Sequence, residues 1–186
     1  IKSSAASDVY KRQVGMRLST RLNMSYYDNQ IIKMACEHIG RDFSSVDASQ
    51  ADSKKGWLNK TPFSLRKFAG NDELFFAQSQ MIEEMAKKGD CIFLGRCADV
   101  VLEHADIPHI SVFIGAPFEE RVKHDMACTG ASYDDTVEKV RNMDRARKAY
   151  YNYYTGRHWG HSENYDMCLN TCLLYTSPSP RDISGS

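Results

Sequence analysis

The sequence has no excess of either charge, because 24 lysines and arginines balance 24 aspartates and glutamates among its 186 residues. A chain without net charge has no long-range attraction for nucleic acid or for an anionic membrane, so we expect neither as a partner. It contains no apolar run long enough to span a bilayer and no apolar signal-peptide core near its start. Its six cysteines include no C-x-x-C pair, which argues against a zinc site or a disulfide framework. These absences predict a cytoplasmic protein with reduced thiols and no metal-ligand set.

The two ends of the chain also lack the pattern of a fold. Residues 1–13 have no period that fits a strand or a core-facing helix, and residues 172–186 turn into a tail of serine and proline. A DNA string that encodes residues 8–13 has a reverse complement that encodes residues 172–177 in a shifted frame, as translated sequencing-library adaptors would. We therefore expect 1–13 and 172–186 to be adaptor-like, non-native segments around a genuine domain at 14–171. Disordered tails are the alternative interpretation.

What is present is ordinary for one globular domain, with 42% hydrophobic and 26% charged residues. Two short, continuous apolar runs lie at 91–94 and 110–114, each bounded by glycine. Such runs predict strands covered on both faces, so we predict an α/β fold in which helices cover a parallel sheet on both sides, in three layers. Shorter strands are predicted at 25–27 and 165–169. Helices are predicted at 14–22, 29–39, 73–88, 96–104, 118–127 and 132–154.

The first central run ends at Gly95 and Arg96, at the edge of a parallel sheet where ligands bind. Glycine permits a sharp turn, and arginine offers a planar fork to an oxyanion, so the pair favours phosphate recognition. A structural ion pair explains the segment equally well. The polar segment 41–70 carries scattered aromatic residues, and its length is typical of a lid or a substrate-binding flap. Asp28 is expected to cap the helix that follows it.

A second charged cluster lies on the long predicted helix 132–154, which Ser132 and Asp135 should open with a capping box. Asp144 and Arg147 are three residues apart and share a face, so the carboxylate can orient that guanidinium or bind a ribose hydroxyl. A solvated helix face is the commoner meaning of such a run. The aromatic residues that follow it favour a segment that closes over a ligand. Asp166 and Asn170 would then lie near the nucleotide end of the sheet, or be polar residues at a strand edge.

Four stretches together resemble the cytidylate kinase-like family, relatives of bacterial CMP kinase among the P-loop nucleoside monophosphate kinases. They are FFAQSQMIEEMAKKGDCIFLGRCADVVL, ISVFIGAPFEERVKH, DRARKAYYNYYTGRHWG and NYDMCLN, and the resemblance covers residues 14–170. Its most specific parts are GRCAD and YYNYYTG-x-x-W. The resemblance implies a parallel sheet with a phosphate-binding loop after its first strand, a monophosphate-binding insertion at 41–70 and an arginine-bearing lid at 141–160.

The resemblance also implies roles for single residues. Arg96 would hold the acceptor phosphate, with Asp28 at the edge of the monophosphate site. Asp144 would bind the sugar. The catalytic cations of the lid would be Arg145 and Arg147, with Arg157 as a further lid cation. ATP with Mg²⁺ would be the phosphoryl donor, and a nucleoside monophosphate the acceptor.

The sequence departs from the family pattern at two places. The Gly-Arg pair is followed in CMP kinases by an aspartate that helps to read cytosine, whereas here Cys97 follows and the nearest carboxylate is Asp99. No G-x-x-x-x-G-K-[ST] motif occurs in the printed sequence, although the family's first strand and phosphate loop should stand just before residue 14.

We therefore expect that the parent protein phosphorylates CMP or dCMP. We expect the 186-residue chain itself to lack the first strand and the phosphate loop and to be inactive or nearly so. The alternatives are a non-catalytic nucleotide-sensing module on the same fold, and a kinase of another small metabolite. The sequence predicts no oligomeric state.

Overall fold

The computed structural model describes residues 6–40, 42 and 72–171, with side chains from residue 11 onward. The tail at 172–186 and all but one residue of the insertion at 41–70 lie outside this part of the chain. Contacts divide the chain into two compact units, which we call the inner unit, Asn23–Pro108, and the flanking unit, Ile1–Leu22 with His109–Ser186. None of the helices in the described part is both long and apolar enough to cross a bilayer.

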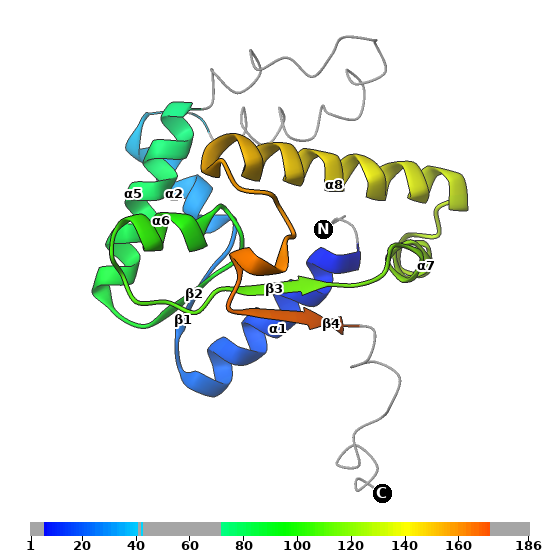
Figure 1. Cartoon of the computed structure of the whole chain (residues 1–186), viewed down its shortest axis with the longest axis horizontal. Helices are drawn as coiled ribbons and strands as arrows, with labels where there is room; N and C mark the ends of the chain where they lie inside the picture. The colour runs from blue at the N-terminus through cyan, green and yellow to red at the C-terminus, as the bar shows by residue number, and fades with distance from the viewer. Residues whose placement is uncertain (1–5, 41, 43–71, 172–186) are drawn as a thin grey trace, which may run out of the picture. The chain divides into compact units, whose positions relative to one another are not determined.

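The inner unit is a pair of parallel strands with helices packed beside it (Figure 1). Its elements are β1 (Ser25–Tyr27), α2 (Gln30–His38), α5 (Asp72–Lys88), β2 (Cys91–Phe93) and α6 (Ala98–His104). Ser25 pairs with Cys91 and Tyr27 with Phe93, and the Leu94 N–H donates to the Tyr27 carbonyl at 2.9 Å. Parallel pairing places the carboxyl ends of both strands at one edge, next to Gly95 and Arg96.

The core of the inner unit lies between α2 and α5. Apolar residues recur at helical spacing on both helices, so each presents one apolar stripe to the other. The buried residues of this core on α2 and α5 are Ile31, Ile32, Ala35, Cys36, Leu74, Ala77, Met81, Ile82 and Met85. This packing holds α2 and α5 together.

The described part of the flanking unit combines a second parallel strand pair with three α-helices. Its elements are α1 (Ala6–Leu22), β3 (Val112–Gly115), α7 (Phe118–Thr129), α8 (Tyr133–Thr155), the short 3₁₀ helix η2 (Ser162–Asn164) and β4 (Met167–Asn170). Val112 pairs with Met167 and Gly115 with Asn170, and Figure 1 shows the two strands side by side. Phe113 of β3 packs against the rings of Trp159 and Tyr165, which holds the segment after α8 on the strand pair.

The helices α7 and α8 pack through both apolar and charged contacts. Val122 and Val140 are fully buried between them. Asp125 is only 1% exposed and accepts two hydrogen bonds from the Lys139 ammonium, at 2.7 and 2.9 Å. A buried carboxylate needs such a partner, since burial of an unpaired charge is costly. The pair therefore fixes the register of the two helices.

Several predicted elements are confirmed with shifted ends. The strand at 25–27 has the predicted bounds, and Ser132 caps α8 by accepting from the Asp135 N–H at 3.2 Å. The expected cap at Asp28 is wrong, because the N-cap residue of α2 is Asn29. The helix expected from 96 begins at Ala98, because Arg96 and Cys97 have positive φ angles that an α-helix cannot contain.

Two other expectations differ from the structure. The helix expected from 14 begins at Ala6, inside the segment expected to be non-native; the non-native origin of 1–13 stays a prediction. Strands buried on both faces are not found in the described part, where each strand has one partner and all four residues of β4 are exposed. Coverage depends on which elements pack above and below a strand, and an apolar run cannot supply that information.

Candidate functional site

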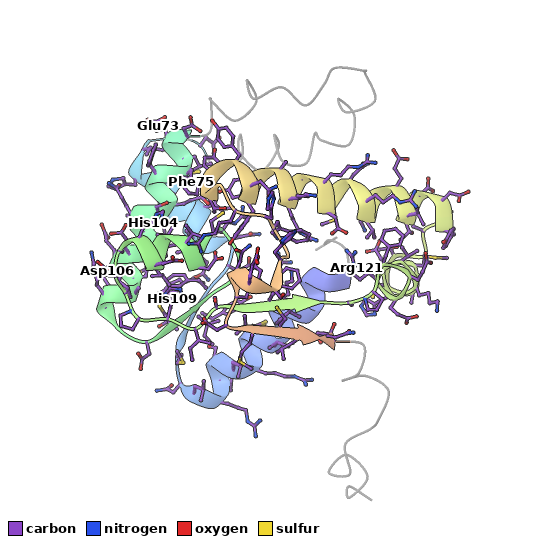
Figure 2. The ribbon with its side chains drawn as sticks, in the orientation of Figure 1. Glu73, Phe75, His104, Asp106, His109 and Arg121 are labelled. Carbon is purple, nitrogen blue, oxygen red and sulfur yellow. The ribbon has the colours of Figure 1, made fainter. Side chains whose placement is uncertain are left out.

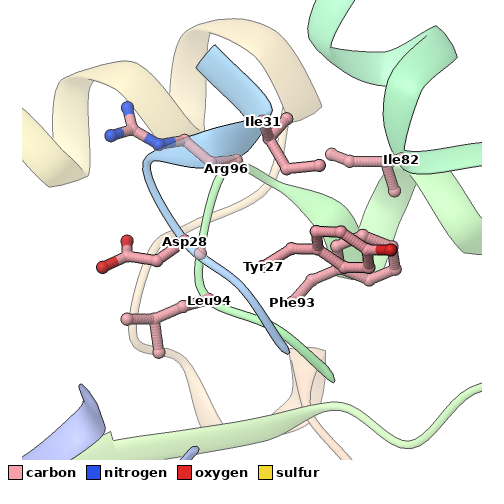
Figure 3. A pocket seen from close by; sticks show the side chains of 8 residues that line it. Tyr27, Asp28, Ile31, Ile82, Phe93, Leu94 and Arg96 are labelled. Atoms are coloured by element: carbon pink, nitrogen blue, oxygen red, sulfur yellow. The ribbon is translucent and has the colours of Figure 1, made fainter. Parts of the chain in front are cut away.

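The inner unit has a small pocket at the carboxyl ends of β1 and β2, which we call the Arg96 pocket (Figure 3). Its apolar wall includes the stacked rings of Tyr27 and Phe93, 5.4 Å apart, and the facing side chains of Ile31 and Ile82. The lining residues are Tyr27, Asp28, Ile31, Ile82, Phe93, Leu94, Gly95 and Arg96. Figure 3 shows the polar heads of Asp28 and Arg96 extending to the side away from the two rings.

The backbone that carries Arg96 is an unusual turn. Gly95, Arg96 and Cys97 all have left-handed φ angles, of 69°, 62° and 57°, and the Ala98 N–H closes the turn on the Gly95 carbonyl at 3.2 Å. Left-handed backbone at a non-glycine residue costs on the order of 1 kcal/mol, and such conformations concentrate at functional sites. Cys97 is only 5% exposed, so its side chain anchors the turn in the core.

The head of Arg96 is held by one hydrogen bond, from its Nη2 to the Oδ1 of Asn29 at 3.1 Å. In the part of the chain that the structure describes, this is the guanidinium's one hydrogen bond, which leaves its other N–H donors for a ligand. Asn29 is the N-cap residue of α2 but makes no side-chain capping bond. The partner of Arg96 in this bond is thus a neutral amide and not a carboxylate. Phosphate recognition by Arg96 stays a prediction.

Asp99 lies in the first turn of α6 and is half-buried. Burial, followed by the negative charge of Asp99, raises the pKa of the Cys97 thiol to about 12, and the Arg96 charge opposes this only in part. The thiol is therefore protonated at neutral pH and is no nucleophile. Asp28, Arg96 and Asp99 thus all belong to the end of the inner unit where β1 and β2 finish.

The flanking unit carries a second charged group, the α7–α8 arginine cluster, made of Arg121, Arg141, Asp144 and Arg147. Both Asp144 oxygens bind Arg121, with Nη2 to Oδ2 at 2.8 Å and Nη1 to Oδ1 at 2.9 Å, and Arg147 Nη1 reaches Oδ1 at 3.3 Å. The side chains of Arg121 and Asp144 are 13% and 24% exposed. The predicted pairing of Asp144 with Arg147 is confirmed, whereas sequence reasoning gave Arg121 no part in it.

The arginines of this cluster are held by further contacts. Arg121, which projects from α7 (Figure 2), also donates from Nε to the Ala116 carbonyl at 3.1 Å. The guanidinium carbons of Arg121 and Arg141 lie 5.7 and 5.4 Å from the ring centre of Phe118. Three cations and one carboxylate leave the cluster net positive, which suits a polyanion such as a phosphate chain. Arg145 is exposed on the same helix, and Arg157 is half-buried just after its end.

Asp166 and Asn170 lie at opposite ends of the strand pair in the flanking unit. Asp166 precedes β4, and its Oδ2 accepts from the Ser111 N–H and from the Ser111 hydroxyl, both at 2.7 Å. These bonds hold the pKa of Asp166 below its usual range. The expectation that Asp166 lies at the nucleotide end is wrong, because it closes the amino ends of the strands. Asn170 pairs with Gly115 at the carboxyl end, as expected.

The predicted site residues thus form two groups. Asp28, Arg96 and Asp99 lie in the inner unit, and Asp144, Arg145, Arg147 and Arg157 in the flanking unit. Sequence reasoning missed Asn29 and Arg121 as parts of these groups, because their partners are 67 and 23 residues away in the chain. No group of three or more metal-ligating side chains occurs among the described residues.

Comparisons with known proteins find a similar solved structure and a matching protein family. The chain is similar to a solved structure described as an uncharacterized protein from Eubacterium ventriosum, with a TM-score of 0.62 and 23% sequence identity over 86% of this chain and 80% of that chain. At this identity the likeness concerns the fold alone. A comparison with curated proteins gives no match. The sequence profile of the cytidylate kinase-like family matches residues 4–172.

Proposed function

We propose that this chain, which belongs to the cytidylate kinase-like family, serves the transfer of a phosphoryl group from ATP to a nucleoside monophosphate, CMP or dCMP. Membership of that family supports a nucleotide kinase-type function. The main observation that supports a nucleoside monophosphate as the acceptor is the Arg96 pocket. There a guanidinium on a left-handed turn lies at the carboxyl ends of two parallel strands. We assign the acceptor phosphate to Arg96.

The choice of a phosphate at Arg96 rests on the donors that this side chain keeps. Asn29 takes one N–H of the guanidinium, and the planar fork retains enough donors to bind two phosphate oxygens at once. The ring stack of Tyr27 and Phe93 lines the same pocket and gives a flat apolar surface next to the charge. We propose that Asp28 borders the acceptor and that Asp99 takes part in reading the base, since Cys97 is buried and protonated.

The α7–α8 arginine cluster is proposed to stabilise the phosphates of the donor. In phosphoryl transfer, positioning and charge neutralisation do most of the catalytic work, and arginines supply both. Arg147 is pre-oriented by Asp144, and we assign Arg145 and Arg157 to the same task as lid cations. Because both Asp144 oxygens already bind guanidinium groups, we propose that this residue orients Arg121 and Arg147. Its predicted bond to the sugar would have to share those oxygens.

We also propose that the fold is of the P-loop nucleoside monophosphate kinase type. A three-layer sheet of the P-loop nucleoside monophosphate kinase type needs a strand and a phosphate-binding loop in addition to the four described strands. The printed sequence contains no G-x-x-x-x-G-K-[ST] motif, which in such enzymes cradles the donor phosphates. For the 186-residue chain, we therefore propose acceptor binding with little or no turnover.

A binding panel followed by a turnover assay tests the proposal. Calorimetric titration of the chain with CMP, dCMP, UMP, AMP and GMP should give the highest affinity for CMP or dCMP. Transfer from ATP with Mg²⁺ to the preferred acceptor should be more than about tenfold slower than in a family member that carries the phosphate loop. Equal affinity for all five nucleotides would contradict the acceptor assignment. Turnover close to that of the loop-bearing enzyme would contradict the inactivity of this chain.

A further inference from the structure

Asn29 departs from the usual behaviour of a helix-capping residue. An asparagine at an N-cap normally accepts a hydrogen bond from a backbone N–H in the first turn of the helix. Asn29 has helical backbone angles, φ −63° and ψ −15°, and makes no such bond. Its Oδ1 instead accepts from Arg96 at 3.1 Å, across 67 residues of sequence.

The two ends of Arg96 are therefore fixed by different means. Its backbone is fixed by the left-handed turn at Gly95–Cys97, which the buried Cys97 side chain anchors. Its side chain contains several rotatable bonds, so the turn alone leaves the guanidinium free to swing. Of the described residues, Asn29 is the one that bonds to the head of Arg96.

The neutral amide is well suited to this task. A carboxylate in place of Asn29 would also accept from Arg96, but it would cancel the positive charge and repel an anion. An amide accepts one N–H and leaves the charge of the guanidinium intact. Its other arm, Nδ2, carries two N–H donors of its own.

We propose that Asn29 is a positioning residue that orients Arg96 toward the phosphate of the acceptor. This inference rests on the proposed function, since it takes Arg96 as the phosphate-binding group. It predicts that Asn29 contributes to phosphate recognition through Arg96 and contributes little to the stability of α2.

The experiment compares CMP with cytidine, which lacks the phosphate, by calorimetric titration of the full 186-residue chain. Wild type should prefer CMP. Asn29→Ala should reduce that preference by about threefold to tenfold, because one hydrogen bond to a charged group is lost. Gln30→Ala, an exposed neighbour at the start of α2, serves as the matched control and should leave the preference unchanged.

Three further variants separate positioning from a structural role. Asn29→Ser shortens the side chain beyond reach of Arg96 but keeps a capping residue, so the thermal midpoint should hold while the CMP preference falls. Asn29→Asp should keep the bond to Arg96 and still weaken CMP binding through charge repulsion. In an Arg96→Ala background, Asn29→Ala should have no further effect on the preference for CMP.

The possible failures are distinguishable. If wild type prefers CMP and Asn29→Ala retains that preference, the inference about Asn29 is wrong and the acceptor assignment stands. An undiminished effect of Asn29→Ala in the Arg96→Ala background overturns the inference in the same way. If wild type shows no preference for CMP over cytidine, the assignment of the phosphate to Arg96 fails, and the inference fails with it.

Discussion

Cys97 shows how the surroundings of one side chain determine its chemistry. The thiol follows Arg96 directly, and a cysteine beside a guanidinium would ordinarily have a lowered pKa. Burial and the nearby Asp99 carboxylate outweigh that charge and raise the pKa to about 12. The thiol therefore stays protonated throughout the physiological range and acts as a small apolar anchor for the turn.

The alkylation rate of the cysteines tests this at the residue scale. At pH 8, Cys97 should react with iodoacetamide far more slowly than Cys128 and Cys168, which are exposed. Because only the thiolate reacts, the alkylation rate of Cys97 should keep rising with pH well beyond pH 9. Peptide mass spectrometry over a pH series measures each site separately. Equal labelling of Cys97 and Cys128 in the folded chain at pH 8 would refute the assignment.

Asp144 is the second residue whose role follows from its partners. One carboxylate binds two guanidinium groups, one from α7 and one from its own helix. Asp144→Asn should lower the free energy of unfolding by about 1.5 kcal/mol, a value between those of exposed and buried charged pairs because the group is partly exposed.

Urea unfolding measures this loss. Glu138→Gln is the matched control, because Glu138 is an exposed acid on the same helix. It should change the free energy of unfolding by less than about 0.5 kcal/mol. If both variants lose the same amount, the shared carboxylate has no special part in joining α7 to α8.

At the scale of elements, the amino end of the β3–β4 pair is closed by a single acid. Asp166 accepts two bonds from Ser111, and its own N–H donates to the Ser111 hydroxyl at 3.0 Å. The hydrogen bonds from Ser111 lower the pKa of Asp166 in the folded state. A lowered pKa means that the ionised form stabilises the fold, and that this stabilisation is lost when the carboxylate is protonated.

The pH dependence follows with a definite sign. The stability difference between wild type and Asp166→Asn should be constant from pH 7 to about pH 5 and should shrink as the pH falls below about 4. Ser111→Ala keeps the acid and the bond from the Ser111 N–H, but it removes the hydroxyl that donates to the Asp166 carboxylate and accepts from the Asp166 N–H. It should therefore show a smaller version of the same change. Chemical unfolding at a series of pH values measures both. A difference that grows toward low pH would contradict the proposed bonding.

Sequence patterns predicted most of these elements because their signals are local. The Ser132 and Asp135 cap of α8, the strand at Ser25–Tyr27 and the apolar stripe of α5 each depend on residues within a few positions of one another. The start of α6 was misplaced because Arg96 and Cys97 carry no sequence signal for a left-handed backbone. Glycine would have been the expected residue there.

At the scale of the whole chain, the candidate site was predicted only in part. Arg96 was found from its position after an apolar run, and Asp144 with Arg147 from their spacing on one helix. Asn29 and Arg121 were missed because their bonds join segments that only tertiary packing brings together. The resemblance to the cytidylate kinase-like family is confirmed by the match over residues 4–172, and it indicates the kinase-type function that spacing alone left open.

The central claim is that Arg96 holds the phosphate of a nucleoside monophosphate. The most direct measurement is the ratio of CMP to cytidine affinity in wild type and in Arg96→Ala, with Lys33→Ala as an exposed control on α2. The account predicts that wild type binds CMP at least about tenfold more tightly than cytidine, as a charged hydrogen-bonding pair should allow. Arg96→Ala should erase that ratio, and Lys33→Ala should leave it intact. A ratio that survives in Arg96→Ala would place the phosphate elsewhere and contradict the account.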